Sequence, residues 1–192
     1  MNTILRAATA IAGALTLSKP ALATDVSYDF LEVRFVDTEI ENIDGDGFAL
    51  GGSYNFHDNW LVTGSYTSQD FDFDLDLTAF EVGVGYVWAL DPKYDLFATG
   101  SYVDIEVDGT GGSASDDGFR FIGGIRSRLN DKIEVRAALN YLDIDDSDTF
   151  VELAGDYYFT DQFAFGITID VGGDADELTL GGRYFFGNRR VR

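Results

Sequence analysis

The sequence predicts an all-β fold, a transmembrane antiparallel up-and-down β-barrel of ten strands. Segments of about ten residues alternate between apolar and other side chains, which is the period of a strand. No apolar stretch reaches the length of a membrane-spanning helix. A chain that spans a bilayer without such helices must close its backbone hydrogen bonds in a barrel. Eight strands are the alternative, in which two of the ten segments are hairpin extensions outside the membrane.

The N-terminus has the features of a secretory signal. Arg6 supplies a positive charge before an apolar stretch over residues 7–17, and Ala21-Leu22-Ala23 has the spacing of a cleavage site. Cleavage there predicts a mature chain that begins at Thr24. The expected division is a signal peptide at 1–23, an outer-membrane β-barrel at 24–186 and a short basic C-terminal tail at 187–192.

The strand pattern repeats along the mature chain. Phe48, Leu50, Tyr54 and Phe56 share one face of a predicted strand that has aromatic residues at one end. Four further segments repeat this arrangement, and partner segments with the same period lie between them. The tetrapeptide Thr-Gly-Ser-Tyr at 63–66 returns at 99–102, which is about one hairpin further along the chain. The chain therefore consists of a series of similar hairpins.

Short turns alternate with longer acidic connections. The short turns lie near His57, Pro92, Asp131 and Asp161. Bacterial outer-membrane barrels have this asymmetry, with short periplasmic turns and longer external loops. The sequence therefore predicts acidic external loops. These loops are expected at 37–46, 69–76, 107–117, 143–148 and 172–176.

Charged residues within the strands share the face opposite the apolar one. An arginine that faces mid-bilayer lipid costs roughly 2–4 kcal/mol, so this face is expected to line the lumen. Opposite charges in a narrow lumen should pair, because unpaired burial is costly. The pairs either plug the lumen or line a narrow pore. The predicted lumenal residues are Glu32, Arg34, Glu81, Arg120, Arg126, Arg128, Glu134, Arg136, Glu152, Asp156 and Arg183, and Asp170 has the same parity.

The hairpin copies and the stretch Gly181-Gly182-Arg183-Tyr184-Phe185-Phe186 resemble the small bacterial outer-membrane β-barrel family of the OmpA and OmpX type, within the porin-like superfamily. The resemblance covers the whole mature chain and implies a location in the outer membrane. It also implies that Tyr184 and Phe186 belong to the signal read by the barrel assembly machinery. Residues 187–192 depart from the family pattern, in which the signal usually ends at the terminal aromatic residue.

No catalytic, metal or cofactor site is expected. His57 lies in a predicted short turn without an evident partner for acid–base catalysis. Residues 42–47 imitate the opening of a calcium loop, but Ser53 stands where a bidentate glutamate is required. A solvated, self-repelling set of acidic loops is the simpler interpretation.

The charge balance limits the partners. The formal net charge is −21 at pH 7 and the chain has no cysteine. A nucleic-acid partner is therefore not expected, nor is a disulfide framework. The expected partners are outer-membrane lipid and lipopolysaccharide, with divalent cations at the acidic loops.

Three functions remain open from the sequence. The first is a non-enzymatic outer-membrane barrel with a structural or surface-interaction role. The second is a narrow porin-like channel for small solutes, whose selectivity the lumenal charges would set. The third is a soluble periplasmic β-barrel binding protein, which would turn its apolar face inward. An outer-membrane enzyme is a minority hypothesis.

Overall fold

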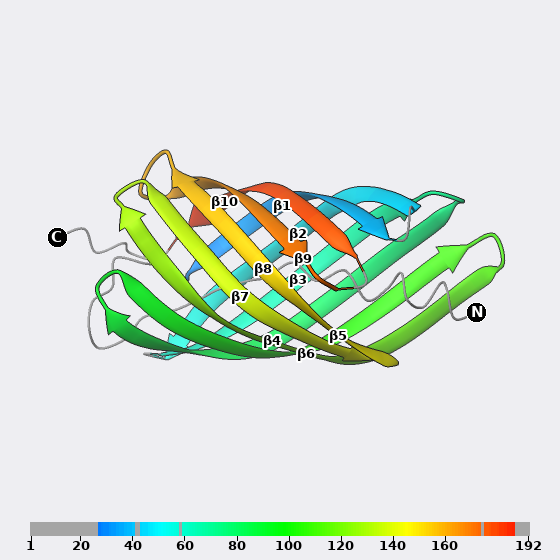
Figure 1. Cartoon of the computed structure of the whole chain (residues 1–192), viewed down its shortest axis with the longest axis horizontal. Coiled ribbons are helices and arrows are strands. Elements are labelled where there is room, and N and C mark those ends of the chain that lie inside the picture. Colours follow the sequence, from blue (N-terminus) through cyan, green and yellow to red (C-terminus); the bar gives the residue numbers. More distant parts are fainter. Residues whose placement is uncertain (1–26, 41–42, 58, 174, 187–192) are drawn as a thin grey trace.

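The strands close into one antiparallel barrel (Figure 1). The computed structural model describes residues 27–186 apart from 41, 42, 58 and 174. Every strand pairs with its neighbours in sequence, and the last strand pairs with the first. The strands are β1 (Phe30–Ile40), β2 (Ile43–His57), β3 (Trp60–Phe71), β4 (Leu75–Asp91), β5 (Tyr94–Gly109), β6 (Gly112–Asn130), β7 (Ile133–Ile144), β8 (Asp146–Tyr158), β9 (Phe163–Val171) and β10 (Asp176–Phe185).

The predicted fold class is confirmed, and ten strands rather than eight form the barrel. Among the described residues, no helix is sufficiently long and apolar to cross a membrane. The division into segments at residues 23 and 187 stays a prediction, because both boundaries lie outside the described residues.

The two ends of the barrel differ. We call the end where β1 begins and β10 finishes the terminal end, and the opposite end the hairpin end. β4, β5 and β6 are the longest strands, with 17, 16 and 19 residues, and they carry the barrel wall furthest toward the hairpin end. The hairpin between β5 and β6 projects at the right of Figure 1.

The prediction of long acidic loops at the hairpin end is wrong for four of the five segments, whereas the described residues between Val171 and Asp176 do lie outside the strands. Most of residues 37–46, 69–76, 107–117 and 143–148 continue the strands, and tight turns join the strands in the last three of these segments. The β3–β4 turn, for example, is Asp72–Asp74, with Phe73 and Asp74 at φ 69° and 55°. The high density of carboxylates suggested loops. The alternation of inward and outward side chains nevertheless continues through these segments, so their backbone can keep pairing with the neighbouring strand.

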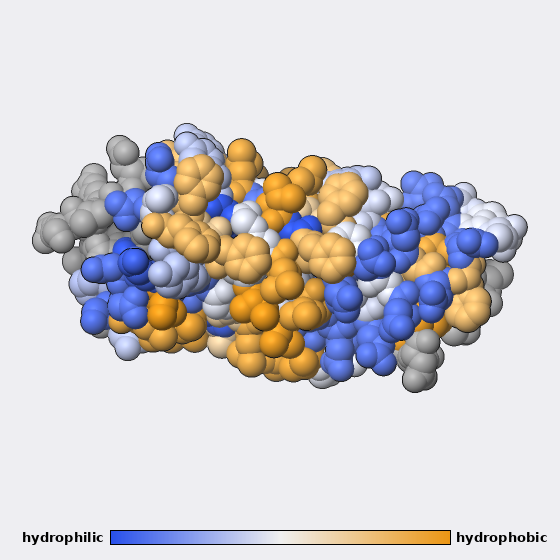
Figure 2. Space-filling view, turned by 90° about the horizontal axis from the view of Figure 1, so that it is seen from above, coloured by the Kyte–Doolittle hydropathy of each residue, from blue (hydrophilic) through white to orange (hydrophobic). Residues whose placement is uncertain are grey.

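An apolar belt surrounds the outside of the barrel. Large side chains such as Phe121 and Phe165 are 54% and 48% exposed, because successive strand residues point to opposite sides of the wall. Aromatic residues gather toward the terminal end, where the Trp60 and Tyr86 ring centroids lie 4.9 Å apart. Figure 2 shows the apolar side chains over the middle of the barrel and hydrophilic side chains over the hairpin end at the right.

This pattern inverts at the hairpin end. On β5 the inward Val103, Ile105 and Val107 are buried, whereas the intervening outward residues are acidic and exposed. Apolar side chains inside and charges outside are typical of a soluble barrel. Five strands, β1, β3, β4, β5 and β7, contribute to this buried cluster, which we call the hairpin-end core. Its residues are Ile40, Phe71, Leu77, Ala79, Val103, Ile105, Val107, Leu142 and Ile144.

Truncation of Leu142 tests the hairpin-end core. Leu142 is fully buried, so Leu142→Ala should lower the free energy of unfolding by about 2–5 kcal/mol. The matched control is Leu139→Ala on the same strand, because Leu139 is 56% exposed in the apolar belt and leaves no enclosed cavity. Denaturant unfolding from lipid vesicles measures both. Equal losses in the two variants would contradict a packed core at this end.

Candidate functional site

The middle of the lumen is polar, and each strand supplies its inward side chains at every second residue. The structure places all of the charged residues predicted to line the lumen on the inner wall, where they are buried. Arg120 and Arg126 are among the largest fully buried side chains. The residues group into ion-pair networks, each made by several strands.

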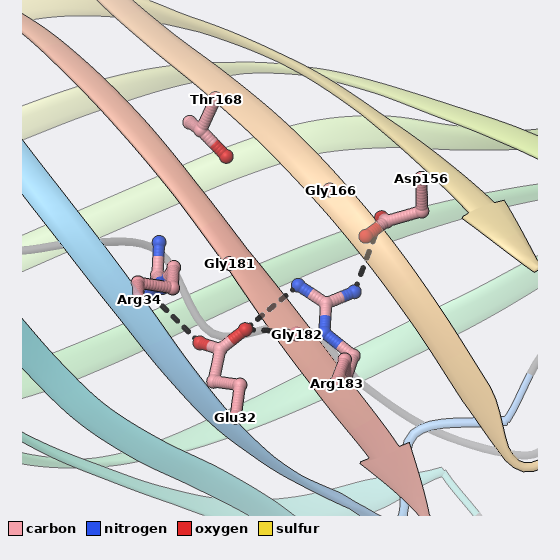
Figure 3. A pocket seen from close by; sticks show the side chains of 8 residues that line it. All are labelled: Glu32, Arg34, Asp156, Gly166, Thr168, Gly181, Gly182 and Arg183. Atoms are coloured by element: carbon pink, nitrogen blue, oxygen red, sulfur yellow. Dashed lines mark hydrogen bonds and ion pairs between the residues drawn. The ribbon is translucent and has the colours of Figure 1, made fainter.

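The first network centres on Glu32 of β1. One carboxylate oxygen of Glu32 accepts a hydrogen bond from Arg34 at 2.7 Å, and the other accepts from Arg183 at 2.9 Å. Arg183 also donates to Asp156 of β8 at 3.2 Å, so the chain of charges runs from β1 through β10 to β8 (Figure 3). A small cavity beside these groups is also lined by Thr168.

A second network lies nearer the terminal end. The Arg126 guanidinium pairs with Glu134, and the Tyr158 hydroxyl donates to the other oxygen of that carboxylate at 2.9 Å. The face of Arg126 lies 4.3 Å from the centroid of the Tyr28 ring. The Tyr28 hydroxyl in turn donates to Asp95 at 2.9 Å. Guanidinium, carboxylate and phenol groups thus bridge the lumen here.

The remaining pairs lie nearer the hairpin-end core. Arg136 pairs with Glu152 across β7 and β8. Arg120 donates two hydrogen bonds to Asn140, at 3.1 and 2.8 Å, and a longer one of 3.4 Å to Glu81. Every arginine in these networks meets at least one carboxylate, as burial of charge requires.

Several buried polar residues were not among the predicted lumenal set. Asp95 and Glu177 face inward, and Glu177 accepts hydrogen bonds from Thr38 and Thr179. Strand parity could have found Glu177, since it alternates with outward Leu178. Parity was ambiguous for Asp95, because apolar residues occupy both faces of β5. Tyr28 shares the parity of inward-facing Glu32 and Arg34, but it carries no charge and was not included in the charged lumenal set.

The other expectations about chemistry can be compared with the structure only in part. His57 is the exposed last residue of β2, and its partner across the ladder is Trp60. Of the calcium-like segment, Ile43–Gly47 lies in β2, whereas Asn42 is outside the described residues. No group of three or more His, Cys, Asp or Glu side chains in the described part of the chain could hold a metal ion.

The outer wall of the hairpin end carries a second candidate site, a continuous row of carboxylates. Asp37 pairs across the ladder with Asp46, Asp46 with Asp70, Asp70 with Asp76, and Asp76 with Asp108. We call these five outward-facing, exposed residues on β1 to β5 the acidic row. Like charges directly opposite on neighbouring strands destabilise a sheet, so the row favours a counter-charge.

The neighbouring carboxylates of the acidic row shift the pKa of Asp76. A hydrogen bond with the Asp70 carboxyl raises the pKa of Asp76, and the negative charges of Asp70, Asp108 and Asp74 act in the same direction. No outward-facing Lys or Arg accompanies the row within the described residues: the arginines are buried in the lumen, and Lys93 and Lys132 lie in turns at the terminal end.

The predicted assembly signal lies at the terminal end. Tyr184 of β10 and Phe186 just after it point outward into the apolar belt, where they are 38% and 45% exposed. Phe186 donates its backbone N–H to the Asp29 carbonyl at 3.1 Å. The basic tail at 187–192 lies outside the described residues.

Comparison with known proteins gives a family match. Residues 7–170 match the sequence model of a family described as outer membrane protein beta-barrel domain. No curated protein matches the chain.

Solved structures that match the chain include a porin, an attachment invasion locus protein and an autotransporter transport unit. KdgM porin is 12% identical with a TM-score of 0.49, over 81% of this chain and 99% of that chain. Ail, the attachment invasion locus protein of Yersinia pestis, is 16% identical with a TM-score of 0.42, over 81% and 94%. The transport unit of the autotransporter AIDA-I from Escherichia coli is 11% identical with a TM-score of 0.50, over 96% and 97%. At 11% identity, this last likeness concerns the fold alone.

Loss of the Glu32 carboxylate tests the first ion-pair network. Glu32→Gln leaves Arg34 and Arg183 without their shared counter-charge, which should lower the free energy of unfolding by about 3–5 kcal/mol. The control is Glu39→Gln, the same change at an exposed position of β1, which should be close to neutral. Denaturant titration of both variants measures the free energy of unfolding. An unchanged value for Glu32→Gln would contradict a tightly paired lumen.

The raised pKa of Asp76 predicts a pH dependence at the hairpin end. Ionisation of Asp76 is less favourable in the folded state than in the unfolded state, so its contribution to stability is complete below the unfolded value of 3.8. That stability is lost as the pH rises through the folded pKa. The Leu75 and Leu77 amides should therefore be better protected from hydrogen exchange at pH 4 than at pH 7, after correction for intrinsic rates.

Asp76→Asn should remove this pH dependence and increase protection at pH 7. Asp131→Asn, an exposed change at the terminal end, is the control and should leave the profile as it is in the wild type. If Asp76→Asn shows the wild-type profile, the Asp70–Asp76 pair is not the cause.

Proposed function

The chain belongs to the outer membrane protein beta-barrel domain family and lies in the outer membrane, and from that premise we propose a closed, non-enzymatic barrel that acts through its acidic hairpin end. Barrels of this class extend further outside the cell than on the periplasmic side. The described connections are short at both ends here, but β4, β5 and β6 carry the wall furthest at the hairpin end, where its outer face is acidic rather than apolar. The hairpin end, with the acidic row, then lies outside the cell. The alternative of a soluble periplasmic protein is wrong, because the family and the location are those of the outer membrane.

The hairpin-end core is the observation that carries the proposal of a closed barrel. Leu77, Val103, Ile105 and Leu142 lie inside the wall and are at most 1% exposed. A hydrated ion that crosses this region would lose its water among side chains that offer no hydrogen bond. Hydrophobic constrictions close channels by this means. The ion pairs beneath the core fill the lumen further.

A narrow porin-like channel is the second candidate, and the polar middle of the lumen favours it. The cavity of Figure 3 is lined by Glu32, Arg34, Asp156 and Arg183, which are groups that could select small charged solutes. The apolar core beyond this cavity favours the closed barrel instead. A solute in the polar section would still meet Leu142 and its neighbours before it reached the outside.

A non-enzymatic role is supported by the ion pairs that the lumenal carboxylates form. The lumenal carboxylates Glu32, Glu81, Glu134 and Glu152 each pair with an arginine, which leaves them poor candidates for proton transfer. His57 is exposed at the terminal end and lies opposite Trp60 rather than a carboxylate.

The partner that the acidic row fits is lipopolysaccharide bridged by divalent cations. Phosphate groups of lipopolysaccharide are anionic and would be repelled by a row of aspartates. A divalent cation that takes oxygen ligands from both, as Ca²⁺ and Mg²⁺ do, converts that repulsion into attraction. It would also relieve the repulsion between neighbouring aspartates.

Neutralisation of the acidic row tests this role. The variant carries Asp→Asn at Asp37, Asp46, Asp70, Asp76 and Asp108, and all five positions are exposed strand residues. Ca²⁺ should raise the unfolding temperature of the wild type in vesicles that contain lipopolysaccharide by about 2–4 °C for each kcal/mol of linkage. The variant should lose most of this shift.

Two controls separate the row from general effects. Sodium chloride at matched ionic strength should give no comparable shift, and the wild type should respond much less to Ca²⁺ in vesicles of neutral phospholipid, where no lipopolysaccharide completes the bridge. A shift in the variant as large as in the wild type would reject the acidic row as the site of cation-bridged contact.

A further inference from the structure

We propose that residues Ser27–Asp29, which precede β1, form a removable strap that closes the periplasmic mouth of the lumen. This goes beyond the proposed function, which concerns the outer face and the permanent core at the hairpin end. The strap residues are all buried although Ser27, Tyr28 and Asp29 belong to no strand. A segment outside the ladder can leave its place without breaking any strand pair.

Asp29 anchors the strap at the rim. Its Oδ1 accepts a hydrogen bond from the backbone N–H of Asn55 in β2 at 2.8 Å. Its carbonyl accepts the backbone N–H of Phe186, just after β10, at 3.1 Å. The two anchors hold Asp29 between the neighbours of β1, and the Tyr28 side chain before it lies in the lumen.

Tyr28 reaches across the lumen to the far wall. Its ring belongs to a buried apolar cluster whose other members come from β3 to β7, none of which adjoins β1. The Tyr28 hydroxyl donates to Asp95 of β5 at 2.9 Å, and Arg126 of β6 lies over the ring. The other members of the cluster are Leu61, Val87, Phe97, Ile122 and Ala138.

The polar groups that the strap covers are suited to hydrogen bonding with water. Both terminal nitrogens of Arg126 are buried and have no hydrogen-bond partner among the described residues. Buried donors of this kind are costly unless water or a solute reaches them. Displacement of Tyr28 would expose Arg126 and the ion pairs above it to the periplasm. The hairpin-end core would stay in place, because strand residues form it.

The accessibility of a single introduced cysteine tests the strap. The chain has no native cysteine, and Ala138 is buried in the cluster against Tyr28. In Ala138→Cys, a small positively charged methanethiosulfonate reagent should react slowly with the folded barrel. Tyr28→Ala in the same background should raise the rate by at least about tenfold, since the ring no longer covers the position. Tyr28→Phe should stay near the slow rate, because it keeps the stacked ring.

Two matched positions control for general loosening. Ile144→Cys, in the hairpin-end core, should stay slow with either residue at position 28, and Lys132→Cys, in an exposed turn, should react fast with either. Asp29→Ala is a second way to release the strap should Tyr28→Ala not refold. It removes the Asn55 anchor and should also raise the rate at Ala138→Cys.

The outcomes separate the strap from the closed barrel. A fast reaction at Ala138→Cys with Tyr28 in place overturns the strap, as does a slow reaction in both Tyr28→Ala and Asp29→Ala. Conductance of the wild-type protein would instead overturn the closed barrel. A barrel with Tyr28 removed should admit the reagent from the periplasmic side and still conduct no ions.

Discussion

The closed ladder of backbone hydrogen bonds is the constraint on which the rest of the molecule depends. In hydrocarbon each unpaired N–H or C=O is costly, so the wall must pair β10 with β1 and leave no edge. Pairing fixes a period of two along every strand. Each strand therefore presents one face to lipid and the other to a lumen that is too narrow to stay empty, and the chemistry of that lumen follows from this division.

The lumen is filled by two kinds of side-chain packing at different levels along the barrel axis. Beside the apolar belt the charged residues face inward, so arginine and carboxylate side chains pair as they do at Glu32 and Arg183. Buried apolar residues such as Leu61 and Phe97 lie on the same inner wall. At the hairpin end the outside meets water, and β5 changes to inward Val103 and Ile105 with outward Asp104 and Glu106. One backbone thus serves as a membrane barrel over most of its length and as a soluble barrel at its outer end.

The sequence predicted the fold and the lumenal charges because both follow from period two. Strand parity placed Arg126 and Glu134 on one face, and the structure pairs them. Parity alone did not reveal where the outside changes from lipid to water, so residues 107–117 were expected as a loop although most of them continue the β5–β6 ladder. Tyr28 escaped prediction for another reason: its contacts with β3 to β7 are long-range, and no local pattern specifies them.

Conductance across a planar bilayer tests the closed barrel most directly. The mature protein, refolded in detergent and shown to insert, should give no discrete current steps, because the hairpin-end core interrupts any hydrated path. Discrete steps in the wild type, with an ion selectivity that Arg126→Ala alters, would contradict the closed barrel and establish the lumenal charges as the lining of a pore.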